Sequence, residues 1–310
     1  MSNIRTLNDL RNQNNSGGGS SQNNPPRGFQ RFEDERSNPQ SSQQRKSLTQ
    51  IGSLLINFLF PGFSLSSVTF TFTALLTLIY ILQLIFYYTG IFGRNTGWPC
   101  LLYKLGAKYT YAISKEYQLW RLITPVFLHS NFMHLFWNVL SFWMVGFQVE
   151  TSIIQSKMKY TLLLAIGGIS GNLLSSVLST EDFGVGASSS LFAVLAYLAF
   201  TFITNFNSQQ MNSMNGPQLA QTFLFMLTMG LTLMNGLMVS GSNVDAYGHL
   251  GGFVAGIMVA MVFKQYNQYK VLKIPAAMML VGYMVGLGVI LFLRRIPHCE
   301  GHGYCDVICE

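Results

Sequence analysis

The stretch VTFTFTALLTLIYILQLIFYYTGIF, residues 68–92, decides the fold class of this chain. It carries no charged residue over more than the roughly 20 positions that a helix needs to cross the hydrocarbon core of a bilayer. Near its end it places Tyr87 and Tyr88, the kind of residue that is enriched at membrane–water interfaces. A stretch of this length without charges predicts a transmembrane helix, which pairs its own backbone groups in lipid.

The composition of the whole chain agrees with this prediction. Of 310 residues, 49% are hydrophobic and only 10% are charged, against roughly 25% charged in a soluble domain. Six further apolar segments follow, at 127–147, 159–179, 187–206, 219–240, 246–263 and 274–293. We therefore predict an all-α, polytopic membrane protein with seven spans. The net charge of +7 is attributed to membrane topology and not to nucleic-acid binding.

Most of the later segments contain polar residues. These residues are His129, His134 and Asn138 in the second segment, Asn172 in the third, Ser188 to Ser190 in the fourth, Asn235 in the fifth and His249 in the sixth. An unpaired polar group in lipid costs several kcal/mol, so we expect these side chains to face the interior of the bundle. The first and seventh segments are predicted to be free of such groups and to face lipid.

The basic residues predict the orientation. Residues 1–67 hold seven Lys or Arg, and the connections at 148–158 and 264–273 add further lysines. The connections at 180–186 and 241–245 hold none and carry acids instead. The positive-inside rule then places the amino terminus in the cytosol and the carboxyl terminus outside, although Arg294 and Arg295 argue the other way.

The chain divides into four predicted parts. Residues 1–50, rich in Asn, Gln and Ser, are expected to be a disordered cytosolic tail without a signal peptide. Residues 51–67 are too short to span and are broken by Pro61, which favours an interfacial or buried segment. Residues 68–265 form the membrane core, and residues 266–310 form the seventh helix and a Cys-rich exoplasmic tail.

The four cysteines test the orientation. Cys100 follows the first span, and Cys299, Cys305 and Cys309 follow the seventh, so all four are expected outside. An even number of cysteines in an oxidising compartment favours two disulfides, with three connectivities open. A metal cluster of the tail thiols with His298 and His302 is the alternative, but no paired CxxC spacing supports it.

A candidate site emerges from three of the segments. Ser188 opens the fourth segment, where a serine is ordinarily a helix cap. His134 and Asn138 lie four residues apart and hence on one helix face. His249 opens the sixth segment, and the predicted topology puts Ser188, His134 and His249 in the outer half of the membrane.

These residue types suit acyl transfer to a serine. A hydroxyl becomes a good nucleophile when a neutral imidazole takes its proton, over about 2.6 to 3.2 Å. Helices must approach closely for that distance, and Gly252 and Gly256 have the small-xxx-small spacing that permits it. The oxyanion needs donors, which His134, Asn138 and the backbone N–H of Ser188 could supply.

Three stretches resemble the signature regions of the rhomboid family of intramembrane serine proteases: WRLITPVFLHSNFMHLFWNVLSFW, GVGASSSLFAVLAY and DAYGHLGGFVAG. The resemblance covers about residues 98–265. The residues that match family motifs are Trp120 and Arg121 in the first loop; His129, His134 and Asn138; Gly186 and Ser188; and His249 with Gly252.

The resemblance implies a rhomboid-like six-helix core followed by a seventh C-terminal transmembrane helix, as in the eukaryotic secretory-pathway branch. It implies a catalytic dyad of Ser188 and His249, with Phe192 packed on the histidine. Substrates would be single-pass transmembrane proteins, cleaved near their exoplasmic end in the secretory pathway or plasma membrane. No cofactor and no metal are implied.

Two positions depart from the family pattern: Ser189 stands where glycine is usual, and Gly248 stands where alanine is common. Ser189 could narrow the cleft, so a catalytically weak or inactive protein that binds and retains membrane clients is the main alternative. A transporter is the other alternative, but a transporter would be expected to show inverted repeats and broken helices, which the sequence lacks. Asp245 could complete a triad, but a helix-capping or loop role is favoured.

Overall fold

The computed structural model describes residues 50–53, 55–56, 59–93, 96–180, 183–205, 216–238, 244–263, 271–295 and 309. The chain divides into two units, Met1–Ser53 and Leu54–Glu310, and all the long helical segments belong to the second. The predicted disordered tail lies almost wholly outside the described residues. The predicted domain boundaries at 50, 67 and 265 stay predictions.

All regular structure in the described residues is helical, which confirms the predicted fold class. The long helical segments are α3 (Val68–Thr89), α6 (Phe132–Ser141) with the π-helical η3 (Phe142–Gly146) and η4 (Val149–Ile154), α7 (Lys157–Leu178), α8 (Ser188–Asn205), α10 (Gly216–Met238), α11 (Ala246–Phe263) and α12 (Lys273–Leu293). Each overlaps one predicted span, although several bounds differ. The connection after α3 holds the short helices α4 (Trp98–Lys104), α5 (Thr110–Lys115), η1 (Leu119–Leu122) and η2 (Thr124–Phe127).

Five of the long segments in the described part of the chain are long and apolar enough to cross a membrane. They are α3, the continuous run Phe132–Ile154, α7, α11 and α12, while α8 and α10 contain the shorter apolar stretches Ser188–Thr204 and Thr222–Thr232. The protein is therefore an integral, multi-pass membrane protein.

The second segment begins and ends later than the sequence suggested. Its first helix starts at Phe132 and not at 127, because the side chain of Asn131 accepts a hydrogen bond from the backbone N–H of His134 and caps the helix. Helical structure then continues to Ile154, where Gln155 adopts a left-handed conformation with φ 53°. The predicted connection at 148–158 is thus reduced to two residues.

Helices α7, α8 and α11 form the centre of the bundle, where glycines permit close contact. A Cβ built on Gly252 would overlap the backbone of Ser189, and one on Gly256 would overlap the backbone of Ala193. This close approach of the two backbones brings the first turns of α8 and α11 within reach of each other. This contact is what places the site.

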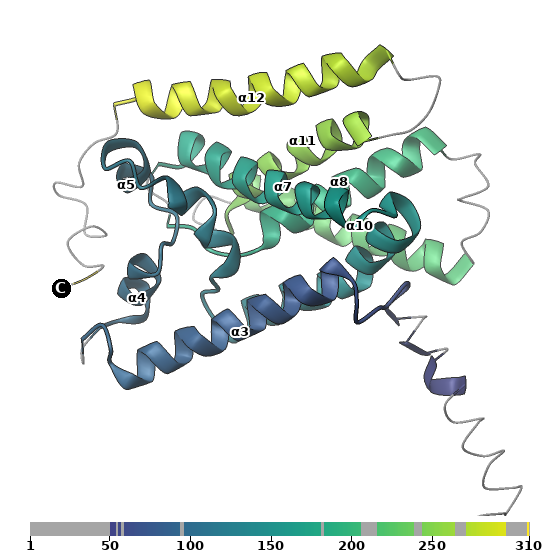
Figure 1. Cartoon of the computed structure of the whole chain (residues 1–310), viewed down its shortest axis with the longest axis horizontal. Coiled ribbons are helices and arrows are strands. Elements are labelled where there is room, and N and C mark those ends of the chain that lie inside the picture. The colour runs from purple at the N-terminus through teal and green to yellow at the C-terminus, as the bar shows by residue number, and fades with distance from the viewer. Residues whose placement is uncertain are drawn as a thin grey trace, which may run out of the picture. The chain divides into compact units, whose positions relative to one another are not determined.

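Helices α3 and α12 flank this central group on opposite sides (Figure 1). Many of their apolar side chains are exposed, as expected for helices that face lipid. The first span, however, is not free of buried polar groups: Gln83 donates to the backbone carbonyl of His129 (3.1 Å) and accepts from its N–H (3.2 Å). This exchange ties α3 to the segment that precedes α6.

Candidate active site

Ser188 is the first residue of α8, and a tight turn delivers it. Gly186 in that turn has φ 125°, a conformation that favours glycine, and its N–H donates to the carbonyl of Pro125 (2.8 Å). A Cβ on Gly186 would come within 2.6 Å of the His134 ring. Glycine is therefore required here for two separate reasons.

Ser188 and His249 meet across the contact of α8 with α11. The hydroxyl oxygen of Ser188 lies 2.8 Å from Nε2 of His249, within hydrogen-bond reach. Nδ1 of His249 is buried and has no hydrogen-bond partner among the described residues. The arrangement is thus a pair, in which no described carboxylate bonds to the histidine.

Phe192 lies one helical turn after Ser188 and covers the histidine. Its ring is stacked on that of His249, with centroids 4.3 Å apart and planes 17° from parallel. Such stacking restricts rotation of the imidazole, which keeps Nε2 directed at the serine.

His134 and Asn138 come from α6. The ring of His134 lies against Gly186, and its Nδ1 is 3.1 Å from the hydroxyl of Ser130. Asn138 is buried and donates to the backbone carbonyl of His134 (2.8 Å). The ring of His129 packs edge-on against that of His134 with centroids 5.2 Å apart.

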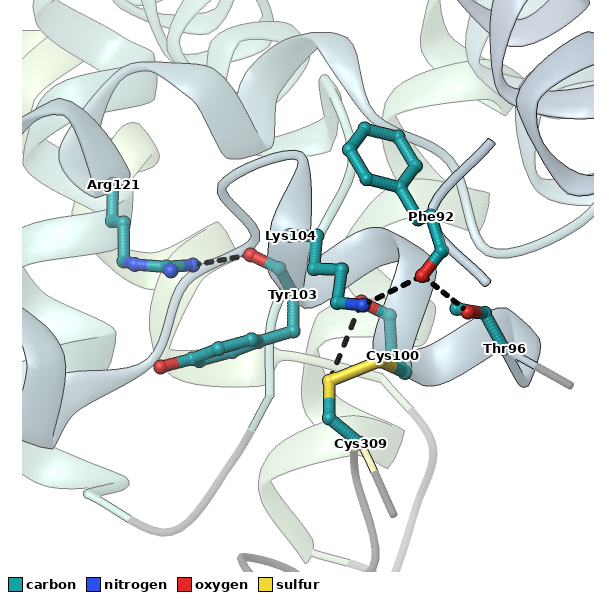
Figure 2. Close-up of a disulfide and its surroundings, with 7 residues drawn as sticks. All are labelled: Phe92, Thr96, Cys100, Tyr103, Lys104, Arg121 and Cys309. Carbon is teal, nitrogen blue, oxygen red and sulfur yellow. Dashed lines mark hydrogen bonds between the residues drawn. A yellow bond between two sulfur atoms is a disulfide. The ribbon is translucent and has the colours of Figure 1, made fainter. Parts of the chain in front are cut away.

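Arg121 organises the loop between α3 and α6. Its guanidinium donates to the carbonyls of Tyr103 (2.8 Å) and Ala107 (2.9 Å) and lies over the Tyr103 ring, 4.3 Å from its centroid (Figure 2). Burial lowers the pKa of Arg121 from its ordinary value, but an arginine remains a cation in proteins. The neighbouring Trp120 is 54% exposed, so it contacts the surroundings and not the site.

Comparison with known proteins matches residues 116–266 to the Rhomboid domain. "Rhomboid-like protease 1" of Toxoplasma gondii is 28% identical over 94% of this chain and 94% of its own length. "RHOMBOID-like protein 1" of Arabidopsis thaliana is 30% identical over 54% of this chain and 40% of its own length. "Rhomboid protease GluP" of Bacillus subtilis is 30% identical over 61% of this chain and 34% of its own length.

The chain belongs to the rhomboid family.

In this rhomboid, Ser189 is accommodated by the neighbouring helix α7. A Cβ on Gly171 of α7 would overlap the side chain of Ser189, so the absence of a side chain at 171 provides the space. Ser189 itself is buried at this contact. The side chain that could have narrowed the cleft therefore lies against α7.

The second departure, Gly248, also has a structural reason. A Cβ there would come within 2.6 Å of the carboxylate of Asp245, which accepts a hydrogen bond from the N–H of Gly248 (2.8 Å). The predicted capping role of Asp245 is thereby confirmed. The residue-by-residue catalytic roles of the site stay predictions.

Sequence reasoning missed three polar residues around this rhomboid site: Gln83, Lys108 and Ser175. Gln83 holds the backbone of His129, while buried Lys108 and Ser175 form a hydrogen-bonded network with half-buried Asp245. Gln83 and Ser175 lie in apolar helical sequence, and Lys108 lies in a loop. No spacing pattern singles out such a residue.

Proposed function

We propose that this rhomboid is an intramembrane serine endopeptidase that cleaves transmembrane segments near their exoplasmic end. Family membership supports an intramembrane protease in general terms. The observation that carries the specific proposal is the 2.8 Å separation between the Ser188 hydroxyl and Nε2 of His249. The alternative of an inactive client-binding protein is not favoured, because nucleophile and base are both present and adjacent.

In the first half-reaction, Ser188 Oγ attacks the carbonyl carbon of the scissile peptide bond while its proton passes to Nε2 of His249. The tetrahedral intermediate then collapses as His249 returns this proton to the amide nitrogen, and the C–N bond breaks. The amine product leaves and an ester joins the substrate acyl group to Ser188.

In the second half-reaction, water attacks the ester carbon as His249 accepts one of its protons. The proton returns to Ser188 Oγ when the acyl–oxygen bond breaks, which releases a carboxylic acid and restores the enzyme. In both halves the oxyanion would be held by the N–H of Ser188 and by the side chains of His134 and Asn138.

We further infer the orientation and substrate class. The amino terminus lies in the cytosol and the carboxyl terminus on the exoplasmic side, in the secretory pathway or plasma membrane. The substrate is a single-pass transmembrane protein, whose helix must unwind locally because helical hydrogen bonds shield the peptide bond. No cofactor or metal takes part in the proposed reaction.

The test is cleavage of a single-pass reporter by purified protein in lipid vesicles, together with labelling by a serine-directed fluorophosphonate. We expect a fragment whose new terminus maps near the exoplasmic end of the reporter helix, and labelling of the native chain. Both should be lost in Ser188→Ala and in His249→Ala.

The matched control is Ser190→Ala. Ser190 is the second neighbour of the proposed nucleophile, and its hydroxyl donates to the carbonyl of Leu164 (2.8 Å). Its removal should leave labelling intact. A native chain that is folded but neither labels nor cleaves would refute the proposal in favour of the client-binding alternative.

A further inference from the structure

Lys108, in the loop between α4 and α5, is a fully buried lysine, with 0% of its surface exposed. A buried ammonium group is costly unless it is paired and hydrogen-bonded. Its environment therefore needs an explanation, and none of the proposed catalytic steps uses it.

The ammonium group is held by α7 and by the start of α11. Nζ donates to the hydroxyl of Ser175 (2.5 Å) and lies 3.9 Å from Oδ2 of Asp245. Ser175 in turn donates to Oδ1 of the same carboxylate (2.7 Å). Lysine, serine and aspartate thus form one network across three parts of the chain.

Asp245 transmits this network to the first turn of α11. The N–H of Gly248 donates to the Asp245 carboxylate (2.8 Å), and the N–H of His249 donates to the Asp245 carbonyl (3.1 Å). The proposed base is therefore attached directly to the residue that Lys108 and Ser175 hold. A shift of Asp245 would rotate or tilt this turn and move the imidazole.

The backbone of the same lysine holds the segment that leads to Ser188. The N–H of Lys108 donates to the carbonyl of Gly184 (2.8 Å), and the N–H of Gly184 donates back (3.2 Å). A Cβ on Gly184 would meet the side chain of Lys108 at 3.1 to 3.3 Å, so the lysine stem lies over this glycine. Gly184 precedes the proposed nucleophile by four residues.

We propose that Lys108 is a positioning residue that sets the distance between Ser188 and His249. Its backbone fixes the approach to Ser188, and its ammonium group, through Ser175 and Asp245, fixes the first turn that carries His249. The inference rests on the proposed function for its effect on rate. Its structural part, the restraint of both segments, holds independently of catalysis.

The test is Lys108→Met, which keeps the length of the side chain but removes the cation. We expect kcat for a single-pass reporter to fall about ten- to hundred-fold, because small misplacements of reacting groups cost up to that much. KM should change less than about two-fold. Fluorophosphonate labelling of Ser188 should slow in parallel. Hydrogen exchange in the peptide covering 244–252 should become faster, whereas the peptide covering 183–192 keeps its main-chain bonds to residue 108 and should change less.

Lys104→Met is the matched control. Lys104 is the last residue of α4, is exposed, and donates only to the carbonyl of Phe92 among the hydrogen bonds found in the described residues. It should leave kcat and the exchange of both peptides unchanged. If Lys108→Met does not fold, Ser175→Ala takes its place and is tested with the same readouts. That variant breaks the network but keeps both charges.

A folded Lys108→Met with native kcat, or with lower kcat but unchanged exchange in both peptides, would overturn the inference. Where Ser175→Ala replaces Lys108→Met as the test, native kcat and native hydrogen exchange in Ser175→Ala would also overturn the inference. If the native chain shows no cleavage that depends on Ser188, the proposed function fails, and the exchange of the two peptides still decides whether Lys108 restrains them.

Discussion

Asn138 illustrates how a polar side chain inside the membrane can have two uses. Its amide donates to the backbone carbonyl of His134 on its own helix (2.8 Å), and it is buried. An amide nitrogen carries two hydrogens, so this bond leaves one for another acceptor. The proposed second acceptor is the oxyanion that forms when Ser188 attacks.

We expect Asn138→Ala to lower kcat about 10²- to 10³-fold, as the loss of one oxyanion donor does elsewhere, with KM nearly unchanged. The comparison is Asn131→Ala, which removes the cap of the same helix and should cost about 1 kcal/mol of stability. That variant should keep kcat per folded molecule. Equal loss of kcat in both variants would assign Asn138 a structural role only.

At the level of the element, Glu150 caps a helix to which it does not belong. Its carboxylate, at the end of the second span, accepts from the N–H groups of Val68 (2.7 Å) and Thr69 (2.8 Å) at the start of α3. The first N–H groups of a helix have no partner within it, and a negative charge there is favourable. Glu150 is only 4% exposed, so this capping occurs away from water.

Glu150→Gln should destabilise the protein by about 1–3 kcal/mol, because the amide of glutamine has only one accepting oxygen for the N–H groups of Val68 and Thr69. Unfolding in detergent, followed by circular dichroism, measures this change. Glu116→Gln is the control, since exposed Glu116 bonds only to Gln118 among the hydrogen bonds found in the described residues. A stability equal to that of the native chain would show that the cap contributes nothing.

The packing of α7 on α8 yields a second test between elements. Gly171→Ala would place a methyl group onto the Ser189 side chain and should cost about 1–3 kcal/mol. Adding Ser189→Gly should recover only part of that loss, because the new methyl group would also lie 2.5 Å from the backbone carbonyl oxygen of Gly248. Gly282→Ala on α12, where a Cβ meets nothing within 4 Å, should be neutral. Additive losses at 171 and 189 would show that the two residues do not compete for one space.

At the scale of the molecule, a disulfide joins the first loop to the end of the chain. Cys100 in α4 is bonded to Cys309, with their Cα atoms 4.8 Å apart (Figure 2). Six long helical segments, from α6 to α12, lie between them in the described chain. The sequence predicts that each crosses the membrane, and six crossings would return Cys309 to the side of Cys100. Cys299 and Cys305 lie outside the described residues, so their predicted pairing stays a prediction.

Loss of this disulfide should lower stability by about 2–4 kcal/mol, because the bond closes a loop of 209 residues in the unfolded chain. Cys100→Ser with Cys309→Ser, compared with the native chain by unfolding in detergent, measures the effect. In protein made in the secretory pathway, neither thiol should react with an alkylating reagent before reduction. Alkylation without reductant would contradict both the pairing and the proposed exoplasmic location.

The sequence by itself determined the fold class and the approximate position of each span, because both depend on local hydrophobicity. Residues 68–89, for example, are an uncharged apolar run that satisfies its backbone groups in lipid by forming a helix. The wrong predictions concerned boundaries and partners: the second span was expected to start at 127 and to end before Glu150, and the first span was expected to be free of buried polar groups. Caps and buried hydrogen bonds decide these features, and they depend on residues far away in the chain.

Only the tertiary structure decided which polar groups meet. Ser188 and His249 are 61 residues apart, and their contact requires the close approach that Gly252 and Gly256 allow between α8 and α11. Lys108, Ser175 and Asp245 come together only because the first loop, α7 and α11 converge behind the site. Hydrophobicity sets which segments enter the membrane, whereas close packing and the cost of unpaired buried polar groups select their neighbours.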